Sequence, residues 1–268
     1  MKRAPRLTVA RFIEALCAAH LSSYVGGYAE DRGGIMVVGP PNSLKSTMVG
    51  VLDKFYHDAV VLSDVNMQML AQLRDTISQG AIRSLVFPEL AKLYERHPQT
   101  AQNVEGALRA FASEGFRSAS FEDSRINRRD ARCFVIGALT PALQTRFFNH
   151  WEETGFNRRF LWPLITFEAK KLEDAVMHWE LLDLRMSFPL TPPDGEIPAV
   201  NTRKMAKIAR ELVSFQPGKG QRALQMAVLT RMYSVLYWHY RKYRRTKSPL
   251  GTILAFARAL GSKGAELS

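Results

Sequence analysis

The residues best suited to chemistry in this sequence are Lys45 and Ser46, which follow a short apolar run. Ile35–Val38 is apolar and mostly β-branched, so it predicts a buried strand. The loop segment GPPNSLKS begins at Gly39, and helical spacing follows it. In a strand–loop–helix context of this kind, backbone N–H groups surround phosphates, a lysine reaches the β- and γ-phosphates, and a serine hydroxyl holds Mg²⁺.

The loop is therefore predicted to bind ATP and Mg²⁺, although one position departs from the pattern GxxxxGK[ST]. Leu44 stands where that pattern has its second glycine. If the position needs a left-handed backbone, leucine costs roughly 1–2 kcal/mol there. The alternative is an ordinary strand-to-helix turn rich in small residues. The predicted nucleotide-binding residues are Gly39, Asn42, Ser43, Leu44, Lys45, Ser46 and Thr47, and Ser46 is also a predicted metal ligand.

Acidic residues follow two further predicted strands. Ile82–Phe87 runs into Pro88 and Glu89, and Glu89 stands where a general base that orients the attacking water is expected. Pro88 occupies the position of an aspartate that would help to hold Mg²⁺. Asp64, after the predicted strand Ala59–Leu62, is a second candidate metal ligand. Glu89 could equally be a first-turn glutamate of the next helix, where the helix dipole favours acids.

A polar residue and a pair of arginines complete the candidate catalytic set. Thr140 follows the predicted strand Cys133–Ile136, where it could contact the γ-phosphate or the lytic water, or merely cap the next helix. Arg158 and Arg159 precede a fifth predicted strand, Phe160–Phe167. Two adjacent guanidinium groups suit phosphate recognition. The alternative is a pair of surface arginines.

Charge is distributed unevenly along the 268 residues. Residues 201–268 contain 14 Lys and Arg against 2 Asp and Glu, whereas residues 1–200 contain 23 of each sign. This asymmetry predicts DNA or another acidic partner, with a basic helical lobe that is simply solvated as the alternative. The two cysteines show no metal-binding spacing, and there is no secretory or membrane-spanning apolar run. We therefore expect a cytoplasmic protein without a membrane partner.

Two basic clusters are the candidate contacts to nucleic acid. The first is the charged tip of a long predicted hairpin with strands Phe116–Phe121 and Ala131–Ala138, and a solvated turn is the alternative. The second lies near the end of the predicted helix Gln221–Arg245, where basic residues would follow the phosphate backbone. The candidate residues are Arg125, Arg128, Arg129 and Arg132 in the tip, and Arg241, Lys242, Arg244 and Arg245 in the helix.

The order of the predicted elements gives an α/β chain followed by a helical lobe. We expect an ATPase domain over residues 1–186, a proline-rich linker over 187–202 and a basic helical lobe over 203–268. Further helices are predicted at Thr8–Tyr24, Met48–Phe55, Val65–Ile77, Leu90–His97, Val104–Ala112, Ala142–Trp151, Arg203–Phe215 and Leu250–Leu260.

This order resembles an AAA+ ATPase. The segments GGIMVVGPPNSLKS, VVLSDVNMQMLAQL, LVFPELAKL, FVIGALTP and GFNRRFLW are similar to those of the helicase-like ATPases of phages, plasmids and integrated elements. The resemblance implies a three-layer P-loop NTPase fold with a five-stranded parallel sheet and a C-terminal helical lobe. It also implies a homo-oligomeric ring that acts as an ATP-dependent motor or switch on DNA, in replication or mobilisation of a mobile element.

The same resemblance assigns roles to single residues. Lys45 and Ser46 correspond to the phosphate-binding pair, Glu89 to the catalytic acid and Thr140 to the first sensor. Arg158 or Arg159 corresponds to an arginine finger that acts on ATP in the neighbouring subunit. Leu44 and Pro88 depart from the family pattern, so a protein that binds nucleotide and assembles on DNA without hydrolysis is the alternative.

Overall fold

A five-stranded parallel sheet forms the centre of the molecule. The computed structural model describes residues 7–26, 32–116, 130–167, 190–200, 219–243, 248–260 and 265–267. The strand order is β2-β3-β4-β1-β5, and every neighbouring pair is parallel, as the sequence predicted. The strands are β1 (Gly34–Val38), β2 (Ala59–Val61), β3 (Ser84–Phe87), β4 (Phe134–Leu139) and β5 (Phe160–Leu161).

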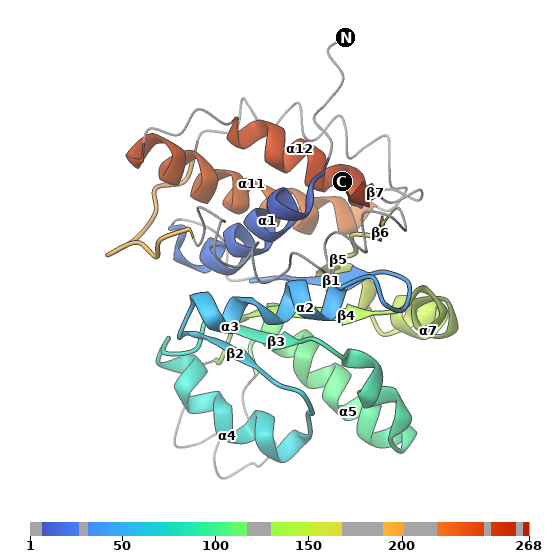
Figure 1. Ribbon diagram of the computed structural model, residues 1–268. Coiled ribbons are helices and arrows are strands. Elements are labelled where there is room, and N and C mark those ends of the chain that lie inside the picture. Colours follow the sequence, from blue (N-terminus) through green and yellow to red (C-terminus); the bar gives the residue numbers. More distant parts are fainter. Residues whose placement is uncertain are drawn as a thin grey trace.

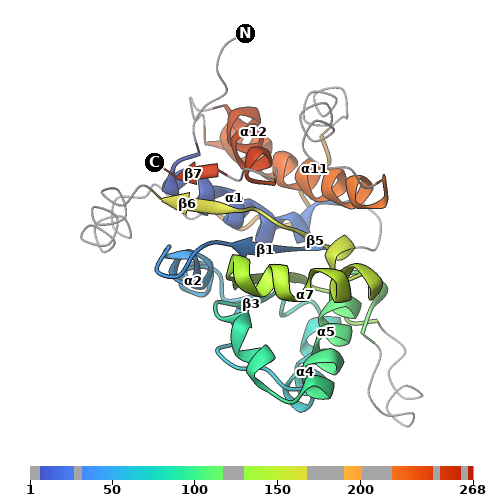
Figure 2. The same cartoon turned by 90° about the vertical axis from the view of Figure 1, so that its right-hand side faces the viewer.

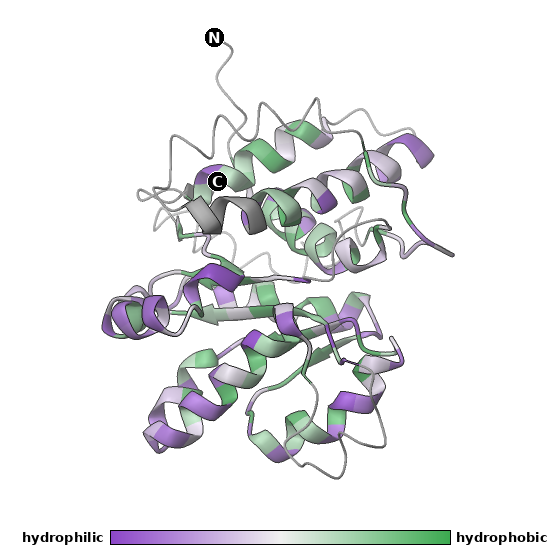
Figure 3. Ribbon diagram, turned by 180° about the vertical axis from the view of Figure 1, so that it is seen from behind, coloured by the Kyte–Doolittle hydropathy of each residue, from purple (hydrophilic) through white to green (hydrophobic). Residues whose placement is uncertain are grey.

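Helices cover both faces of the sheet, so the architecture has three layers (Figure 1). Ile35 and Val37 point to one face and Met36 and Val38 to the other, as the two-residue period of a strand requires. Burial on both faces explains why the strands are continuous apolar runs. In Figure 3, hydrophobic residues gather on the strands between the helical layers.

The first face packs against α1 (Val9–Leu21), α2 (Lys45–Gly50), α11 (Lys219–Lys242) and α12 (Pro249–Ala259). The second face packs against α4 (Met67–Ser78), α5 (Pro98–Arg109) and α7 (Pro141–Glu153). Shorter elements join these layers, namely η1 (Ser22–Tyr24), α3 (Leu52–Phe55), η2 (Leu90–Glu95), η3 (Ala110–Glu114) and η4 (Asn157–Arg159).

Two predicted helices differ from the observed ones. The segment expected as an α-helix over Leu90–His97 is the 3₁₀ helix η2. The helix expected over Val104–Ala112 begins earlier, because Pro98 occupies its first turn, where a missing N–H costs nothing. That helix, α5, then passes into a π-helical turn, η3.

The predicted fifth strand is divided. Phe160–Leu161 joins the sheet as β5, whereas Ile165–Phe167 forms β6 and pairs with β7 (Ala265–Leu267) near the C-terminus (Figure 2). Pro163 lies between the two strands and has no N–H to donate to a ladder, which explains the break. Its carbonyl still accepts a hydrogen bond from the Val38 N–H at 2.9 Å.

The C-terminal helices share a core with the sheet. α11 and α12 pack on α1 and belong to the same buried cluster as Ile35 and Val37. Leu190 and Ile197, from the expected linker, are also buried in this cluster. The described residues of the expected hairpin form one antiparallel bridge between Phe116 and Ala131. The hairpin tip and the helix expected over 203–215 lie outside the described residues, and the division into two domains stays a prediction.

None of the helices in the described part of the chain combines the length and apolarity needed to cross a membrane.

Candidate functional site

The loop after β1 lies at the crevice where the sheet topology reverses. From β1 the chain continues to β2 at one edge of the sheet, whereas from β4 it continues to β5 at the other edge. β1 and β4 are neighbours, and the Gly39 N–H donates to the Leu139 carbonyl at 3.2 Å. Ligands of open α/β sheets bind outside the carboxyl ends of such strands. The loop and Thr140 therefore flank the position that this fold offers to a ligand.

The loop has an unusual backbone. Asn42 and Leu44 have φ values of 60° and 54°, and no other non-glycine residue in the described ranges has positive φ. Asparagine tolerates this region, but leucine is strained there by contact of its Cβ with the backbone. The condition considered for the glycine position of the motif is therefore met, because Leu44 has a left-handed backbone. Strained residues of this kind cluster where a ligand must be held.

A buried hydroxyl lies inside the loop. Ser43 is 2% exposed, and its Oγ has no hydrogen-bond partner. A Cβ on Gly39 would lie 2.7 Å from this Oγ and 3.2 Å from the Ile165 carbonyl oxygen, so only glycine fits at this position. Leaving a buried hydroxyl unpaired costs about 1–3 kcal/mol. Ser43 therefore offers an unused donor inside the loop, and the residues present fit a phosphate ligand.

Lys45 closes over the loop that precedes it. Its Nζ donates to the Pro40 carbonyl at 2.9 Å, and the residue is only 8% exposed. Burial lowers the pKa of the Lys45 ammonium, and the negative charge of Glu89 opposes that shift. The cation is thus held at the loop mouth with a backbone oxygen as its partner. An anion there would stabilise the charged form that burial penalises.

Glu89 follows β3 at the same edge of the sheet. Its carboxylate forms an ion pair with the Lys92 Nζ at 2.6 Å, and about half of the side chain is exposed. Pro88 has no carboxylate to offer, and its ring lies 3.6 Å from where a Cβ of Gly50 would stand. Glu89 is therefore in electrostatic reach of Lys45 but is engaged by Lys92.

Asp64, the second candidate metal ligand, is already engaged. Its carboxylate accepts from the Arg96 guanidinium and from the Val65 N–H. β2, which precedes it, is an edge strand three positions from β1, so roughly 14 Å separates the two strands. A role in binding Mg²⁺ stays a prediction, and this pairing disfavours it.

Ser46 is partly buried at the start of α2, and Thr47 is exposed. No group of three or more His, Cys, Asp or Glu side chains in the described ranges could hold a metal ion. Mg²⁺ is usually held by one or two protein oxygens together with substrate phosphates. The Ser46 hydroxyl fits such a role without an acidic cluster.

Thr140 caps α7, which was the alternative role for this residue. Its Oγ1 accepts from the Leu143 N–H at 3.4 Å, and a proline occupies the first turn of the helix. The residue is partly exposed and follows β4 beside the loop. The cap fixes the side chain at the crevice, and contact with a γ-phosphate stays a prediction.

Arg158 and Arg159 lie at the opposite edge of the sheet. Phe160, which follows them, pairs with Gly34 at the start of β1. The length of β1 therefore separates them from the loop, which is roughly 16 Å for five residues. Arg158 is exposed, and Arg159 is ion-paired with Glu114 at 3.1 Å. A role in ATP chemistry would thus require the site of a neighbouring subunit.

Of the predicted nucleic-acid contacts, Arg132, Arg241 and Lys242 are described. Arg132 forms an ion pair with Asp130 at 3.3 Å, whereas Arg241 and Lys242 are exposed at the end of α11. The Lys242 Nζ lies 4.8 Å from the centroid of the Trp238 ring. Tyr240, on the same helix, is buried. Arg125, Arg128, Arg129, Arg244 and Arg245 lie outside the described residues.

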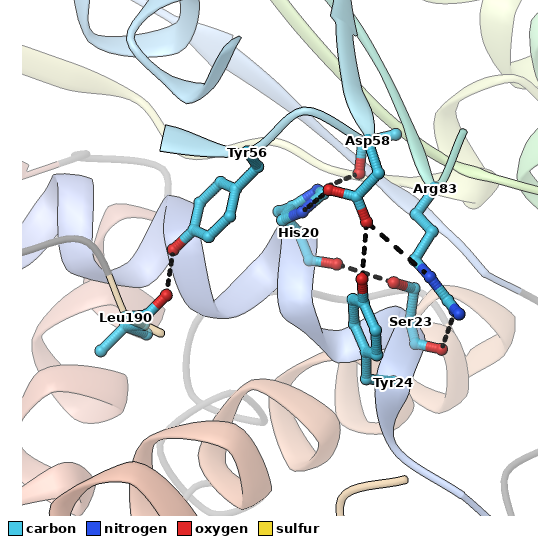
Figure 4. Close-up of polar contacts among 8 residues, drawn as sticks. His20, Ser23, Tyr24, Tyr56, Asp58, Arg83 and Leu190 are labelled. Carbon is cyan, nitrogen blue, oxygen red and sulfur yellow. Dashed lines mark hydrogen bonds and ion pairs between the residues drawn. The ribbon is translucent and has the colours of Figure 1, made fainter. Parts of the chain in front are cut away.

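A buried Ser–His–Asp chain was not predicted from the sequence (Figure 4). His20 Nδ1 lies 2.8 Å from the Ser84 Oγ, and its Nε2 lies 3.1 Å from Asp58 Oδ1. All three side chains are at most 5% exposed, so no substrate reaches the serine. Burial raises the pKa of Asp58, but His20 and a hydrogen bond from Tyr24 outweigh it and bring the pKa to about 2. The cluster joins α1 to the sheet and is structural.

Comparison of the chain with protein-family models, with curated proteins and with solved structures found no match.

Proposed function

We propose that the loop over residues 39–47 binds ATP with Mg²⁺, and that the chain is an oligomeric AAA+-type ATPase that acts on DNA. The observation that carries the proposal is the left-handed backbone of Asn42 and Leu44 around an unpaired Ser43 hydroxyl, closed by Lys45. A strained loop with an unused buried donor is stabilised when an anion enters and accepts from that donor.

Each residue of the loop has a part in holding the nucleotide. Lys45 exchanges the Pro40 carbonyl for phosphate oxygens, which are stronger acceptors because they are charged. Ser43 donates its free hydroxyl, and Gly39 lets that hydroxyl lie close to the backbone. Ser46 offers the oxygen for Mg²⁺, which neutralises phosphate charge when bound. Thr140 lies across the crevice, where it would face the terminal phosphate.

Glu89 is proposed as the base that orients the attacking water. Its half-exposed carboxylate lies after β3 and in electrostatic reach of Lys45. To act, it would have to leave the ion pair with Lys92. An exposed pair of this kind contributes little to stability, so nucleotide binding can readily displace it.

Two observations at the carboxyl edge of the sheet favour a second function. Pro88 supplies no carboxylate, and Glu89 is engaged by Lys92. A protein that uses bound ATP to fix an assembly on DNA, without turnover, would need neither group. Phosphate release measured with and without single- and double-stranded DNA separates the two functions, because only the ATPase releases phosphate.

The C-terminal helices are placed to respond to the loop. The Leu164 N–H donates to the Ala259 carbonyl at the end of α12, 2.7 Å away. The next residue, Ile165, has its carbonyl oxygen against Gly39. A nucleotide in the loop would therefore lie beside a segment bonded to α12, which packs on α11, the helix that carries Arg241 and Lys242. This arrangement supports the proposal that ATP controls DNA binding through these two residues.

The test of the proposal is the affinity for ATP of Lys45→Ala against a matched control. Lys54→Ala removes an exposed lysine from α3, just beyond the loop helix. Hydrogen bonds to charged groups contribute about 1.5–3 kcal/mol, so Lys45→Ala should weaken ATP binding by about tenfold to a hundredfold. Lys54→Ala should leave it unchanged. Equal affinity in a folded Lys45→Ala protein would refute the nucleotide site.

A further inference from the structure

A polar pocket lies at the amino edge of the sheet, the edge opposite the candidate nucleotide loop. Its volume is about 420 Å³, within the range of small-molecule sites. Arg32, Arg83 and Arg132 line it. Each of these arginines stands just before a strand, namely β1, β3 and β4, and the amino ends of these parallel strands meet at one edge.

The guanidinium groups face one another with little acidic compensation. Arg32 and Arg83 both donate to the Ser23 carbonyl, at 3.2 Å and 3.5 Å. Among the described residues, this is the hydrogen bond that Arg32 makes, and it has no carboxylate partner there. Burial lowers the pKa of Arg32, and the positive charges of Arg83 and Arg132 lower it further. Like charges are thus held together in a partly buried site.

Two carboxylates lie near the cluster and are already engaged. Asp130 lines the pocket and pairs with Arg132 at 3.3 Å. Asp58 lies 3.8 Å from the Nε of Arg83, but it is buried with His20 and does not line the pocket. Within the described residues, three guanidinium groups and one carboxylate line the pocket, which gives this part of the lining an excess of positive charge.

Arg83 is held in a fixed orientation. Its guanidinium lies over the Tyr24 ring, 3.9 Å from the centroid, while the Tyr24 hydroxyl donates to Asp58 at 2.7 Å (Figure 4). A stacked, pre-oriented guanidinium loses little freedom when it binds an oxyanion. The site is therefore organised before any ligand arrives.

One feature of the pocket opposes an anion. The C-terminal turn of α4, with Ser78 and Gln79, forms part of the wall. A helix C-terminus carries roughly half a negative charge. The following turn satisfies its last carbonyls, because the N–H groups of Gly80 and Ala81 donate to Ile77 and Thr76. This partial charge is smaller than the excess of the arginine cluster.

We propose that the pocket framed by Arg32, Arg83 and Arg132 binds a phosphate group, in a second anion site separate from the loop after β1. The planar, multiply donating guanidinium suits phosphate oxygens, and three of them from three strands surround such a group on several sides. The phosphate belongs to a small phosphorylated molecule or to a nucleic-acid strand, and both present the same oxygens to the cluster.

The experiment uses the full chain carrying Lys45→Ala, so that the loop after β1 does not dominate the signal. Inorganic pyrophosphate and a short single-stranded oligonucleotide, with and without a 5′-phosphate, are titrated by calorimetry at low salt. Arg32→Gln is the main variant, because the Ser23 carbonyl keeps its bond from Arg83. Arg146→Gln removes an exposed arginine from α7 and is the matched control.

Arg32→Gln should weaken binding of at least one probe by tenfold or more, whereas Arg146→Gln should change it less than twofold. The affinity of Arg32→Lys for the probe should lie between those of Arg32→Gln and Arg146→Gln, because lysine keeps the positive charge and loses the planar guanidinium. Loss of pyrophosphate binding identifies a small phosphorylated ligand. Loss confined to the oligonucleotide identifies a strand.

A second readout separates a binding role from a structural one. Relief of like-charge repulsion should leave the melting temperature of ligand-free Arg32→Gln unchanged or raised, whereas a structural arginine would lower it. Probe affinities equal to those of the parent in folded Arg32→Gln and Arg132→Gln, or no binding of any probe to the parent, would overturn the proposal.

Discussion

The strain at Leu44 can be measured by comparing two replacements at the same position. Leu44→Ala and Leu44→Gly both remove the leucine side chain, so their difference isolates the backbone. At φ 54°, alanine keeps a left-handed cost of about 1–2 kcal/mol, which glycine avoids. Glycine in turn loses about 0.5–1 kcal/mol to the greater freedom of the unfolded chain. Leu44→Gly should therefore be more stable than Leu44→Ala by about 0.5–1 kcal/mol.

The control is the same pair of replacements at Thr47, which is exposed and lies inside α2. Glycine costs about 1 kcal/mol relative to alanine in a helix, so the sign should reverse there. Urea unfolding without nucleotide measures both differences. For a chain of this size each kcal/mol shifts the melting temperature by about 2–4 °C. If Leu44→Gly is no more stable than Leu44→Ala, the left-handed loop, and with it the main support for the nucleotide site, is refuted.

Glu89→Gln should keep ATP binding and abolish any phosphate release, because an amide cannot accept the proton; an unchanged rate would remove Glu89 from the chemistry. Arg158→Ala should lower turnover but not ATP affinity. Mixing this variant with a protein unable to bind ATP should restore some activity at interfaces that the two share. A wild-type protein that stays monomeric with ATP and DNA would contradict a role for Arg158 across a subunit interface. Replacing Arg241 and Lys242 with glutamine should weaken DNA binding across sequences. The slope of log affinity against log salt should also fall by about one unit for each phosphate that the protein no longer neutralises. Binding that does not depend on salt would argue against a role for these residues. The pKa of Asp58 is about 2 in the folded protein against an ordinary 3.8, so the stability that its ionised form contributes is present above about pH 4 and is lost as the pH falls towards 2. The free energy of unfolding of wild type should therefore exceed that of Asp58→Asn by about 2 kcal/mol less at low pH than at neutral pH. A difference that does not change with pH would contradict the pairing.

The sheet and its loop were predictable because their signals are local. An apolar run such as Ile35–Val38 identifies a buried strand, and the glycine, lysine and serine after it are recognised from spacing alone. The glycine that the motif would have at Leu44 raised the question of a left-handed backbone there, which the structure answered. The helix that begins at Pro98 was predicted to begin only at Val104, and the predicted strand Phe160–Phe167 ran through Pro163, although proline suits the first turn of a helix and interrupts a strand.

Contacts between segments that are distant in the sequence could not be predicted from it. Nothing near β6 indicates that β7, about 100 residues later, will pair with it. The chain of Ser84, His20 and Asp58 likewise joins three separate segments, and each residue alone is ordinary. The arginine cluster did leave a signal. Residues that precede parallel strands share one edge, so arginines just before three such strands could have been placed together.

The two edges of the sheet can be related through the strands that join them. β1, β3 and β4 begin just after Arg32, Arg83 and Arg132, and they are followed by Gly39, Pro88 and Thr140. These strands pair in register and are buried on both faces, so they hold the two edges at a fixed separation.

A rigid spacer fixes geometry but cannot switch, because coupling between sites requires an element with two states that both ligands bias. The segment around Leu164 and Ile165 is the contact through which the proposed nucleotide site would reach the C-terminal helices. It touches Gly39 on one side and is bonded to the end of α12 on the other. Under the proposed function, an anion bound in the loop would act on the contact at Gly39 and, through the bond from Leu164 to Ala259, on α12. If nucleotide controls DNA binding as proposed, the control would pass through α12, whereas the proposed ligand of the arginine pocket would bind at the opposite edge of the sheet.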